Sequence, residues 1–76
     1  METIIDEVIA EVARAQKLHR PMTCAHEAYA VIKEELDEFW DEVRKKKPEW
    51  ANLHKELVHV AAMACRAISD ISDRYM

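Results

Sequence analysis

The chain has 76 residues with no glycine and two prolines; 50% of its residues are apolar and 34% are charged. This composition is typical of amphipathic helices in a single domain over residues 1–76, and it excludes folds that depend on glycine turns with positive φ. The net charge of −4 argues against nucleic-acid binding, and no apolar run approaches the ~20 residues that span a bilayer, so we expect neither nucleic acid nor a membrane as a partner.

The cysteines and the N-terminus bear on the compartment. Cys24 and Cys65 are far apart in the sequence and form no CxxC pair. The first residues are acidic and lack the basic start of a secretory signal. We therefore expect reduced cysteines and a cytoplasmic protein.

The first predicted helix covers about Thr3 to Leu18. Its apolar residues recur at helical spacing and predict a core stripe, whereas Glu7, Glu11 and Arg14 are expected outside. The helix should end before Pro21, which cannot continue the hydrogen-bond ladder. The predicted stripe consists of Ile5, Val8, Ile9 and Val12.

The second predicted helix begins after Thr23, a plausible N-cap, and continues to about Lys45. The basic run 44–47 suits a helix C-terminus, although it could also hold phosphates. On a helical wheel, Glu35 and Glu38 lie at the edge of the apolar arc, where they could turn inward. The arc itself contains Tyr29, Ile32, Leu36, Phe39, Trp40 and Val43.

The third predicted helix runs from about Pro48, a favourable first helical residue, to Asp73. Glu56 lies beside its apolar stripe, and the wheel favours a solvent-facing His59. If this helix packs antiparallel to the second one, Glu56 and His59 can face the carboxylates of the second helix. The stripe contains Leu53, Leu57, Val60, Ala61, Ala64, Ile68 and Ile71.

The acidic pairs raise the question of a metal site. Glu35 and Glu38 are three residues apart, so both side chains project from one side of a helix, and like charges at that spacing cost a few tenths of a kcal/mol. A cation between them would remove the cost. The alternative is an ordinary solvated acidic face.

Several other residues leave two interpretations open. His26 can be a helix-start residue or touch a nucleotide, and Phe39 and Trp40 can belong to the core or an oligomer interface, or serve as base-stacking platforms. Lys33 and Arg66 are interpreted as surface charges. The chain offers no Ser-His-Asp or Cys-His arrangement and no glycine-rich phosphate loop, which disfavours covalent catalysis and P-loop chemistry.

The spacing of the acidic residues carries a family resemblance. The pattern Glu34-Glu35-x-x-Glu38, 17 residues, then Glu56-x-x-His59 resembles the EExxE…ExxD signature of MazG-like, all-α nucleoside triphosphate pyrophosphohydrolases. The resemblance covers roughly residues 23–70. Within this family, the chain is similar to a short subgroup whose members often come from phages and other mobile elements.

This resemblance implies a fold, an assembly and a reaction. Members are helical bundles, usually dimers or tetramers, that bind Mg²⁺ through four acidic side chains and hydrolyse nucleoside triphosphates to a monophosphate and pyrophosphate. By position, the ligands would be Glu35, Glu38, Glu56 and His59, with Glu35 and Glu38 also catalytic. The family uses four helices per site, so this three-helix chain would need a second subunit.

His59 departs from the family pattern, which has Asp at that position. Mg²⁺ prefers oxygen ligands, whereas imidazole suits Mn²⁺ better, so Mn²⁺ is a second candidate. Asp41 or Glu42 could replace the missing carboxylate. Two functions therefore stay open: a metal-dependent pyrophosphohydrolase, or a catalytically silent helical module for oligomerisation or partner binding.

Overall fold

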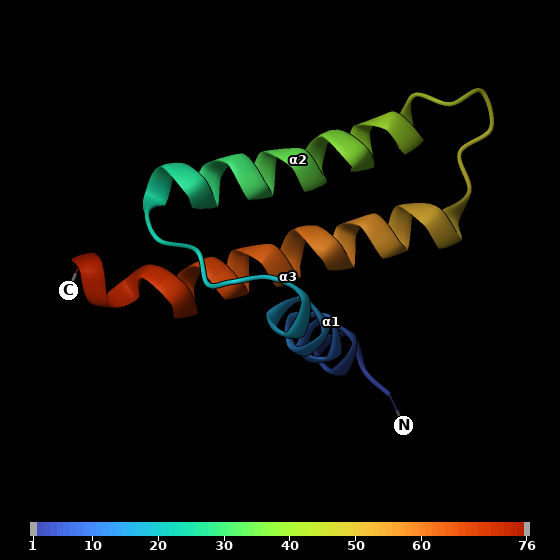
Figure 1. The fold of residues 1–76 in the computed structure, drawn as a ribbon. Coiled ribbons are helices and arrows are strands. Elements are labelled where there is room, and N and C mark those ends of the chain that lie inside the picture. Colours follow the sequence, from blue (N-terminus) through green and yellow to red (C-terminus); the bar gives the residue numbers. More distant parts are fainter. Residues whose placement is uncertain (1, 76) are drawn as a thin grey trace.

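The computed structural model describes residues 2–75, and this range contains three α-helices and no strand, which confirms the all-α prediction. The helices are α1 (Ile4–Leu18), α2 (Ala25–Val43) and α3 (Trp50–Tyr75). Figure 1 shows α2 and α3 side by side and antiparallel, with α1 crossing α3 at a steep angle. Helix α3 is thus the central element. Within residues 2–75, no helix is long and apolar enough to cross a membrane.

The first helix begins with a complete capping box. The Asp6 amide donates to Oγ1 of Thr3 at 3.1 Å, and the Thr3 amide donates to the Asp6 carboxylate at 3.0 Å. These two hydrogen bonds satisfy amides that have no partner within the helix. The helix ends at Leu18, as the position of Pro21 predicts.

The start of α2 differs from the prediction. The N-cap is Cys24, which makes no side-chain capping bond, and not Thr23. The Glu27 carboxylate instead reaches back and accepts from the Thr23 amide at 2.7 Å and from its hydroxyl at 3.1 Å. Glu27 also pairs with Arg20, so this one carboxylate fixes the entry into the helix.

The connection between α2 and α3 is longer than predicted. Helix α2 ends at Val43 and not at Lys45, and α3 begins at Trp50 and not at Pro48. The buried carboxylate of Glu42 accepts from Lys45 Nζ at 2.7 Å and from the Glu49 amide at 3.1 Å. These bonds stabilise a turn between the helices in place of additional helical residues.

The core is thin and is made of small residues and methionines. Half of its buried apolar side chains lie on α3, namely Ala62, Met63 and Ala67. The buried apolar set is completed by Ala15, Met22 and Ala28, and the partly buried residues around it are Val8, Val12, Val31, Ile32 and Ile71.

Much of each predicted apolar stripe is exposed in the single chain. On α1, Ile5 and Ile9 are more than half exposed, so their assignment to the core is wrong; Val8 and Val12 do pack against it. Helix α3 buries a face turned away from its predicted stripe. The exposed large apolar residues on α2 and α3 are Tyr29, Leu36, Trp40, Trp50, Leu57, Ile68 and Tyr75.

Candidate metal centre

Four side chains from the two antiparallel helices meet at one point. Glu35 and Glu38 project from α2, one turn apart, and Glu56 and His59 project from α3, also one turn apart. Each offers one ligand atom, and these four atoms all lie within 4.8 Å of one another. The structure therefore brings together all four residues that the sequence motif selects. We call this group the acidic cluster.

Two carboxylates of the acidic cluster are buried without hydrogen-bond donors. The side chains of Glu35 and Glu56 are only 21% and 15% exposed. Oε2 of each is fully buried and accepts no hydrogen bond from the described residues. A buried carboxylate oxygen without a donor is costly, because its lost hydration is not replaced. Glu38, in contrast, is exposed.

The electrostatics of Glu35 reflect this crowding. Burial, followed by the neighbouring carboxylates of Glu38, Glu56 and Glu34, raises the pKa of Glu35 from 4.5 to about 7. Both causes disfavour the charged form of the side chain. A bound cation would reverse the effect by neutralising the cluster.

His59 lies inside the site and not in solvent. Its Nδ1 is 3.6 Å from Oε2 of Glu35 and 3.8 Å from Oε2 of Glu56, and its side chain is 23% exposed. The wheel-based expectation of a solvent-facing His59 is therefore wrong. The reason is that α3 is covered on two sides, by α2 and by α1, so a residue away from its apolar stripe can still be enclosed.

Helix α1 supplies a further carboxylate that sequence reasoning placed outside. Oε2 of Glu11 lies 3.7 Å from Nε2 of His59, and its side chain is only 12% exposed. The hydrogen bond from Arg14 is the largest cause that holds the pKa of Glu11 below its usual range. One turn away, Glu7 contacts Nε2 of His54 at 2.9 Å. Glu7 and Glu11 are four residues apart and lie beside Val8 and Val12. This spacing is the sequence signal that could have identified the contact between α1 and α3.

A charged hollow adjoins the cluster toward the α2–α3 turn. It has a volume of about 320 Å³ and shares Glu38 and Glu56 with the acidic cluster. Lys45 and Lys55 also line it, which brings one member of the basic run next to the site. Both lysines are paired, Lys45 with Glu42 at 2.7 Å and Lys55 with Glu56 at 3.9 Å, and four carboxylates share the lining.

The two carboxylates considered as substitutes for the missing Asp do not join the acidic cluster. Asp41 is paired with Arg44 at 3.1 Å, and Glu42 is occupied by the turn. Hydrogen bonds from Lys45 and from the Glu49 amide hold the pKa of Glu42 below its usual range. The cluster therefore has His59 as its fourth member.

The other residues that the sequence singles out differ in their exposure to solvent. His26 and Trp40 are exposed and Phe39 is half-buried. Lys33 is a surface charge, as expected, and pairs with Asp37. The prediction for Arg66 is wrong: the residue is 3% exposed and belongs to the interior.

Comparison with protein-family models, curated proteins and solved structures finds no significant match. The relation to MazG-like enzymes therefore stays a prediction that rests on motif spacing.

Proposed function

We propose that this protein is a metal-dependent nucleoside triphosphate pyrophosphohydrolase. The observation that carries the proposal is the pair of buried, unpartnered carboxylate oxygens of Glu35 and Glu56, which face Glu38 and His59 within 4.8 Å. Such a group is unfavourable by itself and becomes favourable around a divalent cation.

The chemistry of the donor set fits a divalent cation. Three carboxylates supply the oxygen ligands that Mg²⁺ prefers, and Nδ1 of His59 adds a nitrogen ligand that favours Mn²⁺. Glu35, Glu38, Glu56 and His59 would hold the ion. When bound, it neutralises phosphate charge and polarises the phosphoryl oxygen.

The reaction requires water to attack the α-phosphorus of the triphosphate. A bond forms between the water oxygen and phosphorus, while the bond from phosphorus to the oxygen that bridges to the β-phosphate breaks and its electron pair leaves with pyrophosphate. We assign the proton of the attacking water to Glu38, because it is the exposed carboxylate of the cluster. We assign the contacts with the leaving pyrophosphate to Lys45 and Lys55, which would have to exchange their pairing with Glu42 and Glu56 for the phosphates.

We further propose that a second copy of the chain completes the molecule, as a dimer or a tetramer. The single chain exposes 5789 Å², about 1,000 Å² more than the roughly 4,800 Å² expected for a folded monomer of 8.9 kDa. A standard protein interface removes about 800 Å² from each partner. The exposed apolar residues of α2 and α3 supply such a face, and pairing two copies through it gives a four-helix arrangement.

The test is a pyrophosphate-release screen over common and modified nucleoside triphosphates, with Mg²⁺ and Mn²⁺ in parallel. We expect turnover that Glu38→Gln lowers by more than about a hundredfold, since changes outside the first ligand shell alone cost 10- to 100-fold. Asp37→Asn is the matched control. Asp37 is an exposed acid beside Glu38 on α2, and it pairs with Lys33. Equal rates in both variants would contradict the proposal.

The second candidate is a silent helical module of the same fold. It is favoured by His59 in the place of a carboxylate and by the exposed apolar residues of α2 and α3. Assembly and metal binding without pyrophosphate release from any nucleotide would support this module and exclude the enzyme.

A further inference from the structure

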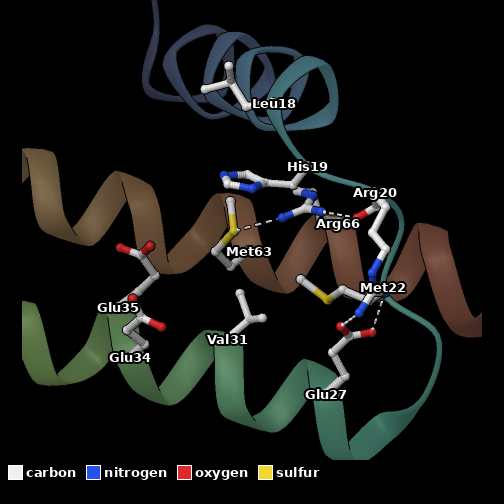
Figure 2. Close-up of a pocket in the computed structure, with 10 residues that line it drawn as sticks. All are labelled: Leu18, His19, Arg20, Met22, Glu27, Val31, Glu34, Glu35, Met63 and Arg66. Carbon is white, nitrogen blue, oxygen red and sulfur yellow. Dashed lines mark hydrogen bonds and ion pairs between the residues drawn. The ribbon is translucent and has the colours of Figure 1, made fainter.

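A second hollow adjoins the acidic cluster on the side away from Lys45. It has a volume of about 450 Å³, lies between the α1–α2 linker (residues 19–24), α2 and α3, and shares Glu35 with the cluster. In Figure 2, Val31 of α2 and Met63 of α3 point into the space between the helices, and Glu34 and Glu35 lie at one end. We call it the linker hollow.

The linker hollow contains a buried cation with an unused donor. Arg66 is 3% exposed, yet its Nε has no hydrogen-bond acceptor among the described residues. Its Nη1 donates to the sulfur of Met63 at 3.3 Å, which is a weak acceptor, and its Nη2 donates to the carbonyl of Arg20 at 3.2 Å. The nearest carboxylate, that of Asp70, is 3.9 Å away. A buried guanidinium with so few acceptors suits a ligand that brings one.

The walls of the two hollows differ in chemistry. Only charged and amide side chains line the hollow beside Lys45 and Lys55. The linker hollow is mixed: four apolar side chains, Leu18, Met22, Val31 and Met63, line it together with six polar or charged ones, among them the buried Arg66. Apolar side chains beside placed polar groups suit a flat organic ring, and of these two hollows only the linker hollow offers apolar side chains.

We propose that the linker hollow binds the base of a nucleotide and that Arg66 selects keto bases, namely guanine, uracil and thymine, over adenine and cytosine. This rests on the proposed function, which places the phosphates at the acidic cluster. The linker hollow shares Glu35 with the acidic cluster, where the phosphates would lie. The sugar of the nucleotide would therefore stay near Glu35, and the base would enter the hollow with the edge opposite its sugar first. That edge carries the group at position 6 of a purine or position 4 of a pyrimidine.

The selection follows from hydrogen-bond chemistry. Arginine has only donors, a keto oxygen accepts, and an amino group at the same position only donates. An amino group in the place of the keto oxygen would leave Nε of Arg66 without an acceptor. Leaving a buried donor unpaired lowers affinity by roughly five- to a hundredfold.

Matched ligand pairs test the proposal. Binding of GMP, AMP, UMP and CMP to the full chain with Mn²⁺ is measured by titration calorimetry, with tripolyphosphate as a ligand that has no base. We expect GMP to bind at least about fivefold more tightly than AMP, and UMP than CMP. Arg66→Met, which removes every guanidinium donor, should abolish both preferences and leave tripolyphosphate binding unchanged. Equal affinities of the wild-type chain for GMP and AMP would overturn the proposal.

A second variant keeps the test decisive if Arg66→Met does not fold. Val31→Phe fills the linker hollow and should weaken all four nucleotides while leaving Mn²⁺ and tripolyphosphate binding intact. Ala30→Phe, at an exposed neighbouring position outside the hollow, is its control. If Val31→Phe leaves nucleotide affinity unchanged, the base lies elsewhere and the proposal is wrong.

The design separates this proposal from the proposed function. Guanosine and adenosine, which lack phosphate, are titrated without metal while the methyl signals of Met22 and Met63 are followed by NMR. Stronger shifts with guanosine would support the base site even if no hydrolysis occurs. Mn²⁺ and tripolyphosphate binding without any difference between the nucleosides would overturn the base site and leave the metal site standing.

Discussion

Nε2 of His59 on α3 lies 3.7 Å from Oε2 of Glu11 on α1, while Nδ1 of the same ring faces Glu35 and Glu56 on the other side. This arrangement places a carboxylate behind the nitrogen that a metal would leave free. In metal sites such an outer carboxylate fixes the tautomer and orientation of the ligating histidine.

Glu11→Gln should therefore weaken Mn²⁺ binding by about tenfold or more, because it removes the negative charge that lies 3.7 Å from Nε2 of His59. The measurement is Mn²⁺ titration followed by electron paramagnetic resonance, in which nitrogen coupling reports the imidazole ligand. Glu7→Gln, which alters the neighbouring contact with His54, is the control and should retain wild-type affinity. Undiminished affinity in Glu11→Gln would show that Glu11 has no such role.

His59→Asp should shift the metal preference from Mn²⁺ toward Mg²⁺, because it replaces a nitrogen ligand with an oxygen ligand and adds a negative charge. The ratio of the two dissociation constants measures the effect. His26→Asp adds the same charge at an exposed position on α2 and should leave the ratio unchanged. An unchanged ratio in His59→Asp would exclude His59 as a ligand.

Without metal, stability should fall as pH rises from about 4.5 to 7. The raised pKa means that the folded chain holds the Glu35 proton across this window while the unfolded chain has released it, so folding is favoured at the acidic end. A shift from 4.5 to about 7 corresponds at most to roughly 3 kcal/mol. Urea unfolding in EDTA at several pH values measures it. Glu35→Gln should flatten the profile, whereas Glu34→Gln should preserve most of it.

Divalent metal should raise the melting temperature by several degrees, since an ion present at 100 times its dissociation constant adds about 2.7 kcal/mol. The gain should disappear in Glu38→Gln and persist in Asp37→Asn. Thermal unfolding followed by circular dichroism, with EDTA, Mg²⁺ or Mn²⁺, gives the comparison. Superimposable curves in all three conditions would mean that the acidic cluster binds no ion.

Trp40→Glu should reduce the assembled protein to single chains, because Trp40 is 57% exposed on the face of α2 that we assign to the partner copy. Sedimentation velocity at micromolar concentration measures the mass. Ile5→Glu places the same charge on an exposed apolar residue of α1 and should retain the assembled mass. A wild-type mass equal to one chain would contradict the interface.

The helices follow from local sequence, whereas the faces they bury do not. The periodic apolar residues and the two prolines locate α1, α2 and α3 to within a few residues. The errors occur where a side chain reaches across sequence: Glu27 holds Thr23 outside α2, and Glu42 holds the Glu49 amide in a turn outside α3. A propensity rule cannot include such bonds, because they depend on how the chain is folded.

The sequence predicts the four residues of the acidic cluster but not the residues that α1 and α3 pack around it. Three-residue spacing identifies Glu35 with Glu38 and Glu56 with His59, and antiparallel packing then brings the pairs together. Nothing in a helical wheel shows which side of α3 receives α1. For that reason the enclosure of His59, the approach of Glu11 and the burial of Arg66 could not be anticipated.

The α1–α2 linker is held by the far end of α3. The Met22 amide donates to the Asp70 carboxylate at 2.9 Å, and the Ala25 amide donates to the hydroxyl of Tyr75 at 3.2 Å, over 48 and 50 positions of sequence. The acidic cluster, by contrast, uses the first half of α3. If the linker opens locally while the cluster stays assembled, amide hydrogen exchange at Met22 measures that opening. Because the Met22 amide donates to Asp70, we expect Asp70→Ala to speed this exchange, although Asp70 lies outside every motif in the sequence.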